Sequence, residues 1–311
     1  YIENEVILFD ETKISNFYRS LEFSSGKMIR TYQYKDLFKI VFIRLLDMTR
    51  HELSYQIVEI EPVNYYGKVT FEFGIDFNTK HWGKTGLWTV NHHDRRSALG
   101  VTTTNQQVYN QYELISNITF ESKHHFEDKL NLERISFVLD CKIRFEKRIV
   151  SLIDKHGQTE LTKFQEEANE ILSQADYYNS YQSNIVFYGD FWDKNDILIE
   201  GDLLNQQGIR YCLFQLINTY HGVSETNNIG AKGLTGESYS GHAFWDTETY
   251  CFPFYLFTNV KAAKNLLMFR YNTLENAILR ARELDCVGAC YPIATLNGDE
   301  ASDLWQHASL Q

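Results

Sequence analysis

The chain has 311 residues, of which 43% are hydrophobic and 23% charged, and this size and composition favour a globular protein with two domains. Its formal net charge of −11 disfavours nucleic acid and anionic membranes as partners, whereas a neutral ligand such as a sugar fits. No apolar run reaches membrane-spanning length and no signal-peptide pattern is present, so we expect a cytoplasmic protein. The sequence starts at Tyr1 without a methionine, and we expect it to be part of a longer polypeptide.

The first half of the chain has the alternation of apolar and polar residues that is typical of strands. Residues 68–77 alternate in this way, and residues 134–145 form a single alternating run through Cys141. Residues 37–46 are apolar on both faces, so we expect a strand that is buried between layers. Many long strands without intervening helices predict an antiparallel β-sandwich over residues 1–150.

The pattern changes to helix after residue 150. Apolar residues recur at spacings of three and four between Leu161 and Ala175, with Glu and Gln between them. This predicts an amphipathic helix, and Thr159 is placed to be its N-cap. We assign residues 151–190 to a helical linker between the sandwich and a helical domain.

Residues 191–311 are patterned as helices that are joined by glycine-punctuated loops, of which Gly230 to His242 is the longest. Asn259 is placed to cap the second of these helices. Three apolar stripes mark the helices: Ile209, Cys212, Leu213, Leu216, Ile217 and Tyr220; Val260, Ala263, Leu266, Leu267 and Tyr271; and Leu274, Ala277, Ile278, Ala281 and Leu284.

The five cysteines are odd in number and stand mostly among apolar neighbours. This favours reduced, buried thiols over a disulfide framework. Cys286 and Cys290 are four residues apart across a glycine, but a metal site would need two more ligands at a suitable spacing, and the sequence offers none. We therefore expect no metal.

The segment 230–248, GAKGLTGESYSGHAFWDTE, resembles the entry to the barrel domain of glycoside hydrolase family 65. That family includes phosphorylases of maltose, kojibiose, nigerose, trehalose and glucosylglycerol. The runs 253–258, 265–271, 288–292 and 297–307 resemble the helices and the loop that follow in the family. The first half of the chain resembles the family's β-sandwich more loosely.

This resemblance implies that residues 191–311 are the first part of an (α/α)6 barrel and that the full-length protein is a homodimer. It also implies transfer of a glucosyl unit from an α-glucoside to inorganic phosphate with inversion. Because phosphate is already an anionic nucleophile, a single carboxylic acid suffices to protonate the leaving oxygen. In the family this acid lies well downstream of the Trp-Asp motif, so we expect it beyond Gln311 and the isolated chain to be inactive. Phosphate is a co-substrate, and no cofactor is implied.

By resemblance, Trp245 and Asp246 bind the glucosyl ring. An indole offers a flat apolar face to the C–H groups of a sugar, and a carboxylate accepts strong hydrogen bonds from two hydroxyls. The alternative is structural: Trp245 packs in the core and Asp246 caps the helix that begins near Thr247. His242 and Glu237 could line the same pocket, although loop-stabilising hydrogen bonds are the simpler role for Glu237. Lys232 is more simply a salt-bridge partner.

The run from Tyr291 to Asn297, which includes Thr295, should face the acceptor side of the site. Several relatives have Trp-Glu after Tyr-Pro, whereas this chain has Ile293-Ala294. The replacement of Trp-Glu by Ile293-Ala294 removes an aromatic stacking surface and a carboxylate. The sequence therefore does not predict which acceptor sugar or polyol is used or which glycosidic linkage is cleaved. Glu248 and Glu300 do not occupy the family's acid motif, and we name no catalytic residue in this chain.

Three functions therefore compete. The first is phosphorolysis of an α-glucoside, with the glucoside and phosphate as the partners and β-glucose 1-phosphate as a product. The second is hydrolysis by water, as in relatives that cleave trehalose. The third is a non-catalytic module that binds carbohydrate or takes part in assembly.

Overall fold

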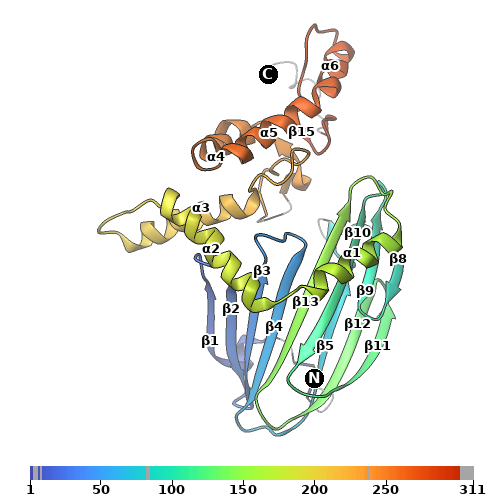
Figure 1. Cartoon of the computed structure of the whole chain (residues 1–311), viewed down its shortest axis with the longest axis vertical. Helices are drawn as coiled ribbons and strands as arrows, with labels where there is room; N and C mark the ends of the chain where they lie inside the picture. Colours follow the sequence, from blue (N-terminus) through green and yellow to red (C-terminus); the bar gives the residue numbers. More distant parts are fainter. Residues whose placement is uncertain (3–5, 8, 82–84, 235, 237, 302–311) are drawn as a thin grey trace. The chain divides into compact units, whose positions relative to one another are not determined.

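The computed structural model describes residues 1–2, 6–7, 9–81, 85–234, 236 and 238–301. Its residues form two compact units, and the boundary between the units falls between Phe191 and Trp192 (Figure 1). The first unit contains two antiparallel sheets and the second is mainly helical. The predicted fold class, an antiparallel sandwich followed by helices, is confirmed.

The larger sheet of the first unit has eight strands in the order β1-β2-β3-β4-β13-β10-β9-β8. The smaller sheet has the order β11-β12-β5, and in both sheets all neighbours are antiparallel. The strands are β1 (Ile14–Leu21), β2 (Met28–Tyr34), β3 (Phe38–Leu46), β4 (Leu53–Pro62), β5 (Gly67–Asp76), β8 (Trp88–Asp94), β9 (Ser97–Thr102), β10 (Gln107–Ser116), β11 (Glu121–Glu127), β12 (Leu130–Leu139) and β13 (Ile143–Asp154). A 3-10 turn, Glu11–Lys13, precedes β1, and β6 (Lys80–His81) pairs with β7 (Thr85–Gly86).

The main core of the first unit lies between the two sheets. The alternation predicted for residues 68–77 is confirmed, because β5 turns Val69, Phe73 and Ile75 into this core and its polar residues outward. The single run predicted over residues 134–145 is wrong. It consists of β12 in the small sheet and β13 in the large sheet, joined at Cys141. Both sheets face the same core, so inward positions alternate in each strand, but the alternation is interrupted between the strands, where Asp140, Cys141 and Lys142 are all exposed.

Strand β3 only partly matches the expectation of a strand buried on both faces. Phe38 and Ile40 belong to the core between the sheets, and Leu45 belongs to a second core on the other face of the large sheet. Lys39, Arg44 and Leu46 are exposed. Strand β3 thus contributes residues to two cores at different points along its length. Its outer face is only partly buried, because the helices cover only part of the outer face of the large sheet.

Helix α1 (Leu161–Ser173) covers that outer face and packs on β13 and β10. Its buried residues Phe164, Ala168 and Leu172 follow the predicted helical spacing. The N-cap predicted at Thr159 is wrong: Glu160 occupies that position and makes no side-chain capping bond. The carboxylate of Asp154 accepts hydrogen bonds from the backbone and hydroxyl of Thr159 instead, both at 2.8 Å, so the threonine belongs to the preceding turn.

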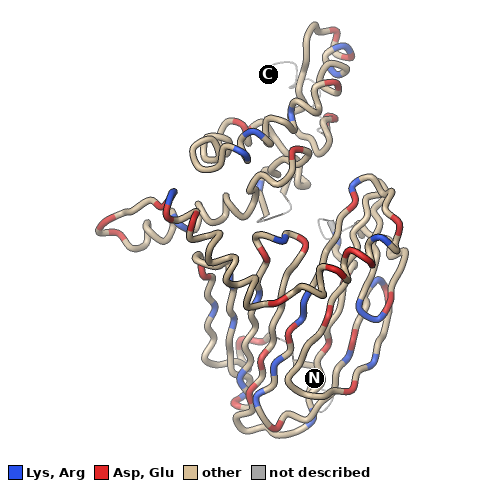
Figure 2. Tube along the Cα trace, viewed as in Figure 1, with Lys and Arg blue, Asp and Glu red and all other residues tan. Residues whose placement is uncertain are grey.

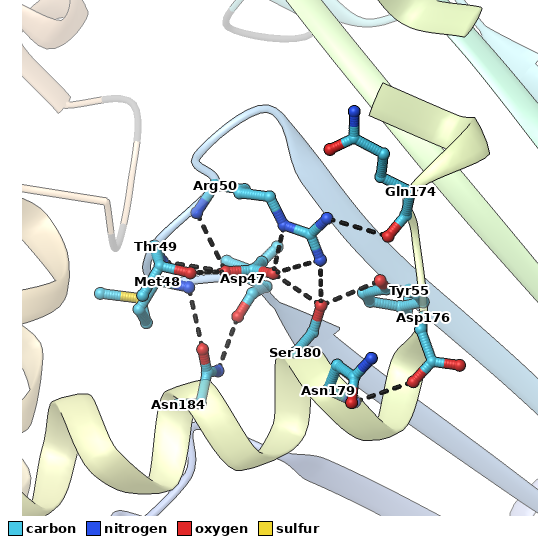
Figure 3. A network of polar contacts seen from close by, with 11 residues as sticks. Asp47, Met48, Thr49, Arg50, Tyr55, Gln174, Asp176, Asn179, Ser180 and Asn184 are labelled. Atoms are coloured by element: carbon cyan, nitrogen blue, oxygen red, sulfur yellow. Dashed lines mark hydrogen bonds and ion pairs between the residues drawn. The ribbon is translucent and has the colours of Figure 1, made fainter. Parts of the chain in front are cut away.

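Helix α2 (Tyr177–Asn195) begins beside a buried polar network that ties it to the turn between β3 and β4 (Figure 3). The hydroxyl of Ser180 donates to Asp47 at 2.6 Å, and Arg50 donates to that hydroxyl at 2.9 Å. Asp47 also accepts from the backbone N–H groups of Thr49 and Arg50, each at 2.9 Å. Burial by itself would raise the pKa of the Asp47 carboxyl, but these hydrogen bonds outweigh it and hold the pKa below its usual value.

Asn184, one turn further along α2, is fully buried. Its amide nitrogen donates to the carbonyls of Ser25 and Leu46 at 2.9 and 2.8 Å. Its oxygen accepts from the backbone N–H of Met48 at 2.9 Å (Figure 3). One side chain therefore binds three backbone groups from two separate segments of the chain.

The second unit contains α3 (Leu203–Thr219), α4 (Phe252–Thr258), α5 (Val260–Asn272) and α6 (Leu274–Glu283). The N-cap predicted at Asn259 is confirmed, since its side chain accepts from Ala262 N–H at 3.0 Å. The predicted face of α5 is partly wrong: Val260, Leu267 and Tyr271 are exposed. The helix buries Ala262, Ala263, Leu266 and Phe269. The reason is close packing, because a Cβ on Gly222 would lie 2.7 Å from the backbone of Ala262.

All five cysteines are free thiols, but the prediction that they are buried is wrong. Cys141, Cys212 and Cys286 are exposed, and Cys251 and Cys290 are half-buried. Apolar neighbours in the sequence did not decide burial, because Cys141 lies at a turn between sheets and Cys212 on the outer face of α3. Within the described residues, no helix is long and apolar enough to cross a membrane.

Candidate functional site

The glycine-rich loop from Gly230 to His242 closes on itself within the second unit. The backbone N–H of Ala231 donates to the carbonyl of His242 at 3.0 Å, and Gly230 forms a bridge with Ala243. A Cβ on Gly230 would lie 2.8 Å from the carbonyl oxygen of Gly241, so this approach requires a glycine. The loop therefore holds its two ends together directly before the Trp-Asp pair.

A short pair of strands joins this loop to the segment near residue 294. Strand β14 (Ala243–Phe244) pairs with β15 (Ala294–Thr295), with Ala243 opposite Thr295 and Phe244 opposite Ala294. Because Trp245 directly follows β14, the pairing brings it to the same region as the Tyr291–Asn297 run. The two predicted halves of the site, about fifty residues apart in sequence, are thus adjacent.

Trp245 and Asp246 lie on the surface of the second unit. The Trp245 side chain is 49% exposed, and Asp246 is exposed as well. Asp246 precedes a π-helical turn, Thr247–Cys251, but makes no side-chain capping bond, and the indole is not packed in the core of the described residues. The turn leads straight into α4. Single π-helical turns inside helices are frequent at functional sites, and this one follows the candidate sugar contacts.

Glu248, on the same π-helical turn, is held by Arg270 of α5. Arg270 donates from Nε at 2.8 Å and from Nη2 at 3.1 Å to the two carboxylate oxygens. The carbonyl of Arg270 accepts a hydrogen bond from the Tyr291 hydroxyl at 3.1 Å. Arg270 therefore connects the turn after Asp246 with the start of the 291–297 run.

Glu300 has the same kind of role next to β15. Its carboxylate accepts from the backbone N–H groups of Ile293 and Ala294 at 2.9 and 3.2 Å, and it pairs with Arg280 of α6 at 2.9 Å. Its side chain is 10% exposed. Glu248 and Glu300 are thus both committed to arginines. Glu237 lies outside the residues that the structure describes.

Two family models match the chain. The N-terminal domain of glycosyl hydrolase family 65 matches residues 1–191, and the central catalytic domain of that family matches residues 210–310. The chain belongs to glycosyl hydrolase family 65. The resemblance found in residues 230–307 is therefore confirmed.

Several relatives of this family-65 chain are phosphorylases. It is 28% identical to an α,α-trehalose phosphorylase of Thermoanaerobacter brockii over 97% of its length, and 28% identical to a kojibiose phosphorylase of Caldanaerobacter subterraneus over 98%. A solved structure named "Putative kojibiose phosphorylase from human microbiome" is 41% identical, with a TM-score of 0.87 over 96% of this chain. The chain spans only 42%, 43% and 41% of these proteins, less than half of each.

The remaining predicted contacts of the family-65 site differ in accessibility. Tyr291 is 38% exposed. His242 is half-buried, and its Nδ1 donates to the Tyr239 carbonyl at 2.8 Å, which orients the ring. Thr295 is fully buried, and its hydroxyl accepts from Gly298 N–H at 2.7 Å. Lys232 lies with its Nζ 5.9 Å from the centre of the Tyr239 ring.

The charges around the pair also act on Cys251. Burial, followed by the nearby charges of Asp246 and Glu248, raises the pKa of this thiol, so it stays protonated and unreactive near neutral pH. Within the described ranges, no three His, Cys, Asp or Glu side chains come together in an arrangement that could hold a metal ion.

Arg270 and Arg280 were not found by the sequence reasoning. Each holds a glutamate about twenty residues away, and neither pair has a local spacing that would signal it. The only available signal was the resemblance of residues 265–271 to the family, which singles out the segment but not the arginine.

Proposed function

We propose that the full-length protein catalyses inverting phosphorolysis of an α-glucoside and releases β-glucose 1-phosphate. A phosphate oxygen forms a bond to the anomeric carbon while the bond to the acceptor oxygen breaks, and a carboxylic acid gives its proton to that oxygen. The observation that carries the proposal is the exposed Trp245–Asp246 pair beside β15, in a chain whose second unit matches the family's catalytic domain.

The pair suits the donor sugar. A half-exposed indole can stack on the C–H face of a pyranose ring, and the adjacent carboxylate can accept hydrogen bonds from its hydroxyls. We propose that Tyr291 and His242 contact the substrate from the sides. The buried Thr295 would not touch the sugar but would position the turn at Gly298, since its hydroxyl accepts the Gly298 backbone N–H.

We propose that the general acid lies outside these 311 residues. Glu248 and Glu300 are both engaged in ion pairs with arginines of α5 and α6, so their carboxylates are committed to structural contacts. The relatives are also more than twice as long as this chain. The second unit would then be the first part of an (α/α)6 barrel, and the intact enzyme a homodimer, which light scattering of the full-length protein tests.

The test uses the full-length protein with trehalose, kojibiose, nigerose and maltose, each with and without phosphate. We expect a glucose 1-phosphate product of β configuration by NMR, formed only when phosphate is present. Release of free glucose at the same rate without phosphate would favour hydrolysis and overturn the proposal. A protein that binds these sugars but turns none over would be the non-catalytic module.

Variants at the pair test its role. Asp246→Asn keeps the shape of the side chain but removes its charge, and we expect kcat/KM to fall about a hundredfold, or about 3 kcal/mol. Trp245→Ala should cause a loss of similar size, and Trp245→Phe should restore part of it. Tyr178→Ala on α2, with a side chain that is 65% exposed, is the control and should leave turnover unchanged. Full activity of the Trp245→Ala, Asp246→Asn double variant would contradict the assignment.

A further inference from the structure

A cavity of about 690 Å³ lies on the outer face of the small sheet in the first unit, on strands that the Trp-Asp site does not use. Two rows of side chains form the floor of this cavity, as the pairing register of the strands shows. In the first row, Thr70 of β5, Ser136 of β12 and Glu121 of β11 lie side by side across the three strands. The next row consists of Glu72, Arg134 and Lys123. The wall is built from three tyrosines, Tyr1, Tyr65 and Tyr66.

Tyr65 is held in a fixed position. Its hydroxyl donates to the carbonyl of Lys68 at 2.9 Å, which folds the ring over the backbone of Gly67. A Cβ on Gly67 would lie 2.9 Å from the Tyr65 hydroxyl oxygen and 3.0 Å from Cζ, so the glycine is what lets the ring lie there. The same ring packs against the core between the two sheets, so it is only partly open to the cavity and serves as a fixed part of its wall.

The other two tyrosines complement it. Tyr66 is 67% exposed although it lines the cavity, which leaves a large apolar ring in contact with water. Tyr1 is anchored, because its hydroxyl donates to Glu72 at 3.0 Å and the guanidinium of Arg134 lies 5.2 Å from its ring centre. The carbonyl of Tyr1 accepts from Thr70 N–H at 3.0 Å, which adds this segment to the edge of β5.

The floor is polar but its charges are largely balanced. Arg134 is paired with Glu72 through hydrogen bonds at 2.9 and 2.5 Å, and the hydroxyls of Thr70 and Ser136 bond each other at 2.9 Å. Lys123 and Glu121 carry opposite charges on the same strand. Acidic and basic residues are likewise interspersed along the strands of the first unit (Figure 2). Lys68 also lines the cavity, so three basic side chains face Glu121 and the Arg134-bound Glu72. A polyanion would meet only a small excess of positive charge, whereas a neutral ligand rich in hydroxyls would find both donors and acceptors.

We propose that this cavity is a second carbohydrate site, which binds a neutral oligosaccharide by stacking on the exposed ring of Tyr66, beside the fixed ring of Tyr65, and by hydrogen bonds to the Thr70–Ser136 row. Aromatic faces beside a few placed polar groups are the general form of a site for such ligands. The site belongs to the first unit alone and does not depend on the proposed phosphorolysis.

The test is calorimetric titration of the whole 311-residue chain with maltoheptaose and cellohexaose as neutral probes and dextran sulfate as an anionic one. We expect a neutral probe to bind in the millimolar range or tighter, and Tyr66→Ala to weaken it about tenfold. Gly67→Ala should weaken it as well, because it displaces the Tyr65 ring without removing any side chain of the wall. The matched control is Tyr18→Ala on β1, a tyrosine that is 57% exposed and outside the cavity, and it should change the affinity less than twofold.

Three results would overturn the proposal. The first is no heat of binding with either neutral probe up to about 10 mM, well beyond a millimolar Kd. The second is binding of dextran sulfate alone, which would assign the cavity to anions. The third is equal loss in Tyr66→Ala and Tyr18→Ala, which would place the binding elsewhere. Trp245 offers a second surface on which a probe can stack, so the titration is repeated in the Trp245→Ala variant. We expect this variant still to bind the neutral probe, and we expect the addition of Tyr66→Ala to weaken that binding.

Discussion

Arg270 of α5 donates two hydrogen bonds to Glu248, at 2.8 and 3.1 Å, and so joins α5 to the π-helical turn that follows the Trp245–Asp246 pair. The Arg270 side chain is 12% exposed and that of Glu248 is 25% exposed, so water screens the pair only in part. The pair fixes the turn that follows Asp246, and the Arg270 carbonyl fixes Tyr291. An ion pair that does no chemistry itself can therefore decide where the sugar-binding groups lie.

Arg270→Gln tests this pair. We expect the free energy of unfolding of the second unit to fall by about 2 kcal/mol, because Glu248 is left partly buried without its cation. Urea unfolding followed by far-UV circular dichroism measures the change. Arg282→Gln, at an exposed position on α6, is the control and should have an effect below about 0.5 kcal/mol. Equal stability of the two variants would show that the pair contributes little.

Asn184→Ala tests the junction between α2 and the large sheet. The substitution removes the partner of three backbone groups, at Ser25, Leu46 and Met48, and we expect a loss of about 3 kcal/mol in the stability of the first unit. Asn179→Ala, near the start of the same helix and exposed, should cost less than about 1 kcal/mol. Thermal unfolding of the two variants side by side gives the comparison, and matching midpoints would refute the role of the buried amide.

Glu133 predicts acid sensitivity of the sandwich. Burial by itself would raise the pKa of this carboxyl, but hydrogen bonds from Arg96, at 2.6 and 2.9 Å, and from Arg95, at 2.8 Å, outweigh it and lower the pKa to about 2. A carboxyl whose pKa is lower in the folded state stabilises the fold above its unfolded pKa. We therefore expect about 3 kcal/mol of stability to be lost as the pH falls from about 4.5 to about 2.

The measurement for Glu133 is urea unfolding at a series of pH values. Glu133→Gln should be less stable at neutral pH and should lose less further stability over this acidic interval. Glu121→Gln, exposed on β11, is the control and should keep the wild-type slope. A wild-type slope in Glu133→Gln would assign the acid sensitivity to other carboxyls.

Lys147 predicts a gain of stability as the pH rises in the alkaline range. Burial lowers the pKa of its ammonium group to about 8, although the group donates to the Gly74 carbonyl at 2.6 Å. The unfolded chain then binds the proton more tightly than the folded one, so this group makes stability rise as the pH increases from about 8 to about 10.5. Its contribution over that interval is about 3 kcal/mol.

Lys147→Met checks this, because the variant should lack the alkaline gain that Lys147 provides. The difference between wild type and variant, measured by urea unfolding from pH 7 to 10.5, isolates this group from other residues that titrate there. Lys123→Met, at an exposed position of β11, should keep the wild-type dependence. A constant difference between wild type and Lys147→Met across the interval would mean that the lysine does not titrate as proposed.

Several features of the protein follow from the sequence alone. The alternation in residues 68–77 gives the inward face of β5, and Asn259 marks the start of α5 by its capping oxygen. The segment 230–248 identifies the family and the Trp-Asp pair. These features are local, since side-chain period and capping depend on residues within a turn or a strand of each other.

Contacts between distant residues were decided by the tertiary structure. The run 134–145 is divided between two sheets at residues 140–142, and neither the pairing of Arg270 with Glu248 nor that of Arg96 with Glu133 has a local pattern. Alternation of apolar and polar residues is the same in every strand that has one face on the core, so it does not show to which sheet the strand belongs. Which strand lies beside which, and which charge meets which, depends on packing between segments tens of residues apart, and no short stretch of sequence records it.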